Sequence, residues 1–204
     1  MKRTLINAVL IGSLMIIGSL SSIANAGLIF YIYESGNNVV IEGSGSVDTT
    51  NLPLAFTNTE MGFFNGTQSV GVGNSNNTSY FRVSVTGDGN FGNAGWPGHG
   101  NLHTGMFFGF DSDRYFYLPA GYVSNSFISG TTTYLNRTMA SLGLITGDYS
   151  YLASSSGTRI TNTVDIFVGR APTPAAPVSE PSTLLISAFG LFALAFRRVR
   201  KHNK

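Results

Sequence analysis

The chain has 204 residues, no cysteine and a formal net charge of +2. Its basic residues gather at the two ends, so that residues 27–177 hold five arginines against nine acidic residues, a net charge of about −4. This acidic body excludes nucleic acid as a partner, because phosphate binding needs a basic face. The lack of cysteine excludes thiolate metal sites and thiol catalysis.

The first 26 residues predict a secretory signal peptide. A basic pair at positions 2 and 3 precedes an apolar stretch, residues 5–20, which predicts a signal helix. Ala24 and Ala26 then form the small-x-small site that suits signal peptidase. We therefore expect export, with cleavage after Ala26.

Residues 27–170 predict one all-β domain, an antiparallel β-sandwich that is jelly-roll-like. Residues 28–34 and 39–42 are rich in aromatic and β-branched residues and flank a turn cluster, which predicts a hairpin. Residues 80–86 alternate with period two, so that Phe81, Val83 and Val85 face one way. Further short strands are expected at residues 114–118, 126–128, 131–135, 148–152 and 164–168. Regular short strands separated by turn residues are typical of a sandwich or barrel.

A short helical turn is expected within residues 138–142. Met139, Ala140 and Leu142 permit a helix there, and Gly143 is suited to end it.

Two histidines stand four residues apart, a spacing that places both on one face of a helix, as in some metal sites. However, the segment around His99 and His103 is rich in glycine and contains Pro97, which excludes a helix and removes the meaning of the spacing. A metal site formed by His99, His103 and either Asp111 or Asp113 stays a hypothesis that no sequence motif supports.

Acidic turns offer a second possible cation site. Asp111 and Asp113, and separately Asp88 beside Asn90, could hold calcium through oxygen ligands. Neither segment fits the twelve-residue loop with its closing glutamate, and aspartate beside glycine is common in simple turns. Calcium stays open, and no other cofactor is expected.

No catalytic constellation stands out in the body. The sequence has no Gly-x-Ser-x-Gly elbow to prepare a serine nucleophile. We therefore expect a protein that is not an enzyme.

Trp96, the single tryptophan, lies in a loop rich in glycine and proline near Asn93 and Asn101. A flat ring beside amide groups could contact a sugar, and loops on a sheet scaffold commonly carry binding. The alternative is that Trp96 folds back over the core, as large aromatic residues usually do.

The last part of the chain predicts a membrane anchor. Residues 171–178 are a proline-rich spacer, expected to be extended. An apolar run follows that is long enough for a short transmembrane helix when flanking residues are recruited. Its anchoring side chains are Leu184, Leu185, Ile186, Phe189, Leu191, Phe192, Leu194 and Phe196.

Basic residues follow the apolar run and predict its orientation. They include Arg197, Arg198, Arg200 and Lys201, which under the positive-inside rule hold this end in the cytoplasm. A buried core helix with a solvated basic end is the alternative. The predicted signal peptide favours the anchor, since an exported chain can be arrested at such a segment.

These residues together resemble a PEP-CTERM sorting signal, residues 179–204. Ser179, Glu180, Pro181 and Ser182 form the motif, with Ser179 where the family has its first proline. The resemblance implies cleavage near Glu180 and Pro181 by an exosortase, a membrane peptidase. It also implies transient anchoring in the inner membrane, then a location at the cell surface or in extracellular polysaccharide and biofilm.

The sequence therefore predicts an exported, non-enzymatic surface or matrix protein. Its expected partners are signal peptidase, an exosortase, membrane lipid and extracellular polysaccharide. The alternatives are a carbohydrate-binding module centred on Trp96 and a calcium-dependent adhesin.

Overall fold

The computed structural model describes residues 26–65, 68–93, 95, 97–155 and 161–173. The chain divides into two units, Met1–Ala171 and Pro172–Lys204, and the described strands belong to the first. The predicted signal helix, the predicted transmembrane helix and Trp96 lie outside the described residues.

The centre of the first sheet is the hairpin expected from the sequence. Strand β1 (Gly27–Ser35) pairs antiparallel with β2 (Asn38–Ser46) across a tight turn at Gly36, whose φ is +60°. Glycine suits this turn because a left-handed φ costs it nothing. Leu28, Phe30 and Ile32 of β1 are fully buried, as the two-residue period of a strand requires.

Among the described residues, seven strands form this sheet in the order β7-β12-β13-β1-β2-β11-β8. The strands other than the central hairpin are β7 (Ser84–Gly87), β8 (Leu102–Thr104), β11 (Ile128–Tyr134), β12 (Gly147–Ser154) and β13 (Thr161–Val168). Strands β1 and β13 pair in parallel, with Gly27 opposite Thr163 and Ile32 opposite Val168. The fully antiparallel sheet expected from the sequence is therefore corrected to a mixed one.

In the part of the chain that the structure describes, six strands form the second sheet in the order β3-β6-β10-β9-β5-β4. They are β3 (Leu54–Glu60), β4 (Phe63–Asn65), β5 (Ser69–Val72), β6 (Asn76–Arg82), β9 (Phe108–Asp111) and β10 (Tyr115–Pro119). All the pairings in this sheet are antiparallel.

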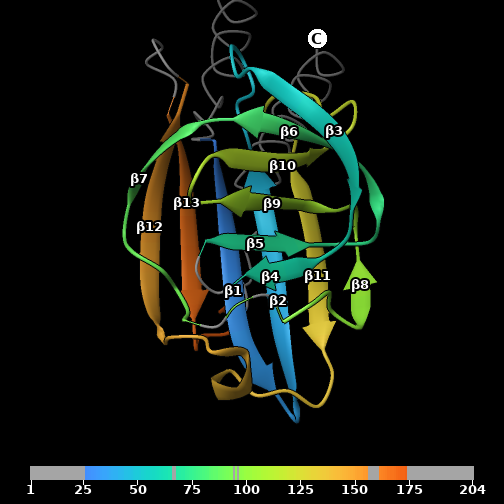
Figure 1. The fold of residues 1–204 in the computed structure, drawn as a ribbon, viewed down its shortest axis with the longest axis vertical. Coiled ribbons are helices and arrows are strands. Elements are labelled where there is room, and N and C mark those ends of the chain that lie inside the picture. Colours follow the sequence, from blue (N-terminus) through green and yellow to red (C-terminus); the bar gives the residue numbers. More distant parts are fainter. Residues whose placement is uncertain (1–25, 66–67, 94, 96, 156–160, 174–204) are drawn as a thin grey trace, which may run out of the picture. The chain divides into compact units, whose positions relative to one another are not determined.

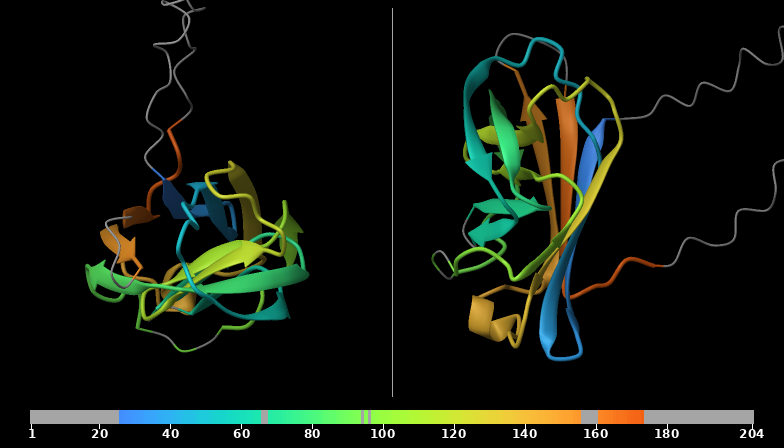
Figure 2. Two further views of the ribbon diagram at one scale, coloured as in Figure 1. Left: turned by 90° about the horizontal axis from the view of Figure 1, so that it is seen from above. Right: turned by 90° about the vertical axis from the view of Figure 1, so that its right-hand side faces the viewer.

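The two sheets face each other, and their strands run across one another rather than side by side (Figures 1 and 2). This arrangement confirms the predicted β-sandwich, in the crossed form of sheet packing. The jelly-roll detail of that prediction stays a prediction.

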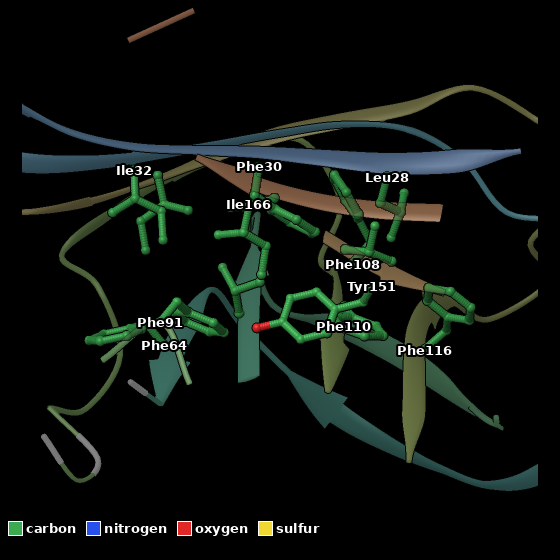
Figure 3. Close-up of a cluster of buried hydrophobic side chains, with 14 of the residues drawn as sticks. Leu28, Phe30, Ile32, Phe64, Phe91, Phe108, Phe110, Phe116, Tyr151 and Ile166 are labelled. Carbon is green, nitrogen blue, oxygen red and sulfur yellow. The ribbon is translucent and has the colours of Figure 1, made fainter. Parts of the chain in front are cut away.

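Aromatic and aliphatic side chains from both sheets fill the space between them (Figure 3). The first sheet contributes Leu28, Phe30, Ile32, Val164 and Ile166, and the second contributes Val70, Val72, Phe108, Phe110, Phe116 and Leu118. Phe110 packs against Phe116 and Tyr151, with ring centroids 5.6 and 5.4 Å apart. Since the described residues contain no cysteine, burial of this kind and strand pairing hold the domain together.

The predicted strand at residues 80–86 is divided between the two sheets. Phe81, Val83 and Val85 all pack against the same core, as the alternation predicts. However, β6 ends at Arg82 in one sheet and β7 begins at Ser84 in the other. The Val83 N–H donates to the carbonyl of Arg114, next to the last pair between β6 and β10. The chain therefore crosses from one layer to the other at Val83.

Several other predictions can be compared with the strands. The strands expected near residues 114–118, 131–135, 148–152 and 164–168 are present with shifted ends. The one expected at 126–128 is wrong except for Ile128, where β11 begins. Strands β3, β4, β5, β8 and β9 were not expected.

The expected helical turn is present as a 3-10 helix over Ala140–Leu142. Gly143 ends it with a φ of 65°, and its N–H donates to the carbonyl of Ala140. Within the part of the chain that the structure describes, no helix is long and apolar enough to cross a membrane.

Replacing Phe110 with alanine tests the core. Phe110 is fully buried, so F110A is expected to lower the free energy of unfolding by about 3 to 5 kcal/mol, because it removes apolar contacts and leaves a cavity. F127A is the matched control: Phe127 is 75% exposed, and its removal is expected to change stability by at most about 0.5 kcal/mol. Equal losses in the two variants, measured by urea denaturation, would contradict this packing.

Candidate functional site

Most of the predicted sorting residues lie outside the described part of the chain. These are Ala24, the motif Ser179 to Ser182, the apolar anchor and the basic residues behind it. Ala26 is described, and its carbonyl accepts a hydrogen bond from the N–H of Thr163 at 3.2 Å. Strand β1 begins at Gly27, directly after the predicted cleavage site, so cleavage there would leave the strand whole.

The two candidate histidines are held by the fold. His103 lies on β8, where its Nδ1 is 3.1 Å from Thr132 Oγ1 and its Nε2 is 3.1 Å from the carbonyl of Gly100. Burial lowers the pKa of His103, which favours the neutral ring. The ring of His99 meets Phe63 edge-on at 6.5 Å. Both ring nitrogens of His103 thus lie within hydrogen-bond distance of protein atoms, so a structural role accounts for the presence of this histidine.

The acidic segments considered for calcium form turns. Asp111 Oδ1 accepts from the N–H of Asp113 at 2.7 Å, within the connection between β9 and β10. Asp113 pairs with Arg114 at 2.8 Å, and Asp88 accepts from the N–H of Ser150 at 2.8 Å. Among the described residues, no three acidic or histidine side chains are grouped so that they could hold a metal ion.

The loop that contains Trp96 is described on both sides of that residue. The carbonyl of Gly98 accepts from Tyr134 Oη at 2.9 Å, and Asn101 Oδ1 accepts from the N–H of Leu135 at 2.8 Å. The N–H of Asn93 donates to the carbonyl of Gly143 at 2.9 Å. The Asn101 amide oxygen, one of the groups suggested for a sugar contact, therefore has a structural role.

A row of cross-strand partners traverses the outer face of the six-stranded sheet. Successive pairs join Phe56 to Tyr80, Tyr80 to Tyr117, Tyr117 to Gly109, Gly109 to Gly71, and Gly71 to Phe63. The row touches all six strands. Its side chains point away from the main core, because their neighbours Phe81, Phe116 and Phe64 belong to that core.

The rings of this face form a continuous cluster, here called the aromatic strip, which comprises Phe56, Tyr80, Tyr115, Tyr117, Phe107 and Phe63. Phe56 stacks on Tyr80 with centroids 4.2 Å apart, and Tyr80 meets Tyr117 at 4.9 Å. Tyr117 in turn meets Phe107 at 6.0 Å. Each such ring pair adds about 0.5 to 1.5 kcal/mol beyond its buried area.

Glycine makes room for the middle of the strip. A Cβ atom at Gly71 would lie 2.5 Å from Cε2 of Phe107. One at Gly109 would lie 2.4 Å from the carbonyl oxygen of Val70 and 3.0 Å from Cδ2 of Tyr117. The rings of Phe107 and Tyr117 thus lie over strands β5 and β9 where other residues would carry side chains.

Two carboxylates fix the tyrosines of the strip. Tyr117 Oη donates to Asp111 Oδ2 at 2.9 Å, and Tyr80 Oη donates to Glu60. Burial is the largest cause that raises the pKa of each tyrosine, and the nearby carboxylates raise it further. Both phenols therefore remain protonated donors at neutral pH.

Phe56 is the exposed end of the strip. It lies on the edge strand β3 and is 46% exposed, whereas Tyr80, Tyr117 and Phe63 are each below a tenth. Sequence reasoning missed it. The sequence signal for a second aromatic face was the set of aromatic doublets, such as residues 63–64, 80–81 and 107–108. Two adjacent rings in extended backbone lie on opposite faces of a sheet.

Replacing Gly71 with alanine tests the strip. The new methyl group would collide with the buried ring of Phe107, so G71A is expected to lower the free energy of unfolding by about 1 to 3 kcal/mol. G89A is the control, because no atom lies within 4 Å of the position that its new methyl group would take, and no loss is expected. Equal stability of wild type and G71A in urea would contradict the position of Phe107.

The buried tyrosines predict a loss of stability in alkali. Burial, the largest cause, raises the pKa of Tyr33 and Tyr151 from 10.0 to about 12, and the pKa values of Tyr80, Tyr117 and Tyr134 are also raised. A raised folded-state pKa stabilises the fold fully below the unfolded pKa, and this contribution is lost as pH rises above about 10. Urea denaturation should therefore show decreasing stability from pH 10 to 12, and a flat profile would contradict it.

Comparison with known proteins gives one positive finding. Residues 177–201 match the family described as the PEP-CTERM protein-sorting motif. The comparisons with curated proteins and with solved structures gave no match. The residues that match include the predicted motif, the apolar run and most of the basic residues, so the chain carries a PEP-CTERM protein-sorting motif at residues 177–201.

Proposed function

We propose that this protein is a non-enzymatic component of the cell surface or extracellular matrix, delivered there by its C-terminal sorting signal. The PEP-CTERM motif supports an exported protein that is sorted via an exosortase. The proposal adds cleavage near Glu180 and Pro181, and release of the β-sandwich toward extracellular polysaccharide and biofilm. The match at residues 177–201 is the observation that carries it.

The folded domain suits such a route. It forms without cysteine, so its stability does not depend on oxidation after export. The N–H of Gly169 donates to the carbonyl of Ile32, and the proline-rich spacer follows two residues later. The last strand is therefore complete before the spacer begins, and cleavage near Glu180 would leave the sandwich intact.

The described side chains support a binding or structural role better than catalysis. Asp111 and Glu60 accept hydrogen bonds from buried tyrosines, and His103 is engaged at both nitrogens. These two carboxylates and this histidine are of the kinds that a hydrolytic site uses, and each of the three has a structural partner. The alternative function, carbohydrate binding, is favoured by the exposed ring of Phe56, while Trp96 lies outside the described residues.

Mass spectrometry of the mature protein tests the sorting proposal. The chain recovered from the cell surface or culture medium is expected to begin at Gly27 and to lack Arg197 through Lys204. P181A is expected to accumulate uncut in the membrane, because it alters the motif. P174A, in the spacer, is the matched control and should be processed like the wild type.

Recovery of a surface chain that runs from Gly27 through Lys204 would contradict cleavage and favour a permanent anchor. Equal processing of P181A and P174A would contradict the role assigned to the motif.

A further inference from the structure

We propose that the exposed end of the aromatic strip binds a neutral polysaccharide, with Phe56 as the stacking ring. The inference rests on the proposed function in one respect, since export is what brings the protein to such a ligand. It assigns the contact to strand β3 and its neighbours instead of the loop at Trp96.

Neighbouring aromatic rings fix the position of the Phe56 ring. One face of its ring is covered by Tyr80 at 4.2 Å with the planes 23° apart, and Tyr115 meets it edge-on at 5.8 Å. Tyr80 is itself buried and hydrogen-bonded to Glu60. A ring fixed from behind and 46% exposed loses little conformational freedom when a ligand covers it. The apolar C–H face of a pyranose ring matches such a surface.

Polar groups border this ring on two sides. Asn58 lies two residues along β3, on the same face as Phe56, and its Nδ2 donates to Glu60 Oε1 at 3.1 Å. On the other side, the exposed Arg82 is paired in register with Tyr115. An apolar ring with a few fixed hydrogen-bonding groups around it is the usual composition of a small-molecule site, and sugar hydroxyls can use both donors and acceptors.

Charge favours a neutral ligand over an acidic one. Glu60 and Asp111 lie on the face of the strip, and residues 27–177 carry a net charge of about −4. Arg82 is an opposing cation beside the ring, but the two carboxylates and the net negative charge of the body would repel a polyanion. Nothing similar opposes an uncharged polysaccharide.

The edge of β3 is poorly suited to a second copy of the chain. Its pairing with β6 shifts register between Leu54 and Phe56, which marks a bulge or irregularity. Bulges are one of the devices that prevent an edge strand from pairing with another chain.

Affinity electrophoresis of the full chain in non-ionic detergent tests the proposal, with dextran, laminarin, galactomannan and xylan as neutral probes and alginate as the acidic one. At least one neutral probe should retard the protein, and alginate should not. Calorimetry with the retarding probe should then show about tenfold weaker binding for F56A, as expected when a central aromatic contact is removed.

Two further variants separate stacking from general apolar contact. F56L keeps an apolar side chain without a ring and should weaken binding as much as F56A, whereas F56Y should bind like the wild type. L152A removes an exposed apolar side chain from the other sheet and should leave binding unchanged. Circular dichroism melting checks that each variant is folded.

The proposal is wrong if none of the four neutral probes binds, if F56A binds like the wild type, or if F56L keeps full affinity. If W96A loses binding and F56A binds like the wild type, the site lies in the loop that contains Trp96 instead. Processing of the tail is measured separately in cells and should be normal in F56A. If the protein binds polysaccharide but its tail stays uncut, the proposed sorting is contradicted and the binding proposal is not.

Discussion

Neighbouring side chains on a pleated strand point to opposite faces, and the six-stranded sheet uses this to divide its aromatic residues between two layers. Phe81 and Phe116 point into the sandwich, while Tyr80 and Tyr117 point out. A shift of one residue in the register of β6 or β10 would exchange the two sets, so the register of this sheet determines both the core and its outer surface.

The inner layer explains why the domain can exist without disulfides. Its rings come from both sheets and interlock where the strands cross (Figure 3). The outer layer is less usual for a sheet that faces solvent, since polar residues are expected there. Its buried tyrosines bond to carboxylates, and its glycines admit rings that would otherwise be excluded. The rings of the outer face bury one another, which reduces the apolar surface exposed to water, except at Phe56.

The sequence predicted the parts of the fold that depend on local pattern. The hairpin of β1 and β2 has clear alternation and a glycine turn, and Gly143 ends a helical turn as expected. The parallel pairing of β1 with β13 was not predictable, because it joins segments about as far apart in the chain as the domain allows. No residue of strand β3 is buried, so β3 lacks the alternation of buried and exposed residues that marks a strand. The sorting signal was readable because its motif, apolar run and basic end follow one another directly. The rings of the aromatic strip come instead from β3, β4, β6, β10 and the residue before β9, and only long-range register brings them together.

Ring-to-ring nuclear Overhauser effects test most directly whether the aromatic residues are divided between two faces. The spectrum should show a chain of contacts from Phe56 through Tyr80 and Tyr117 to Phe107, and a separate set that joins Phe110 to Phe116 and Tyr151. Direct contacts of Tyr80 or Tyr117 with Phe110 or Ile166 would show that the register of the sheet is different and that the outer aromatic face does not exist.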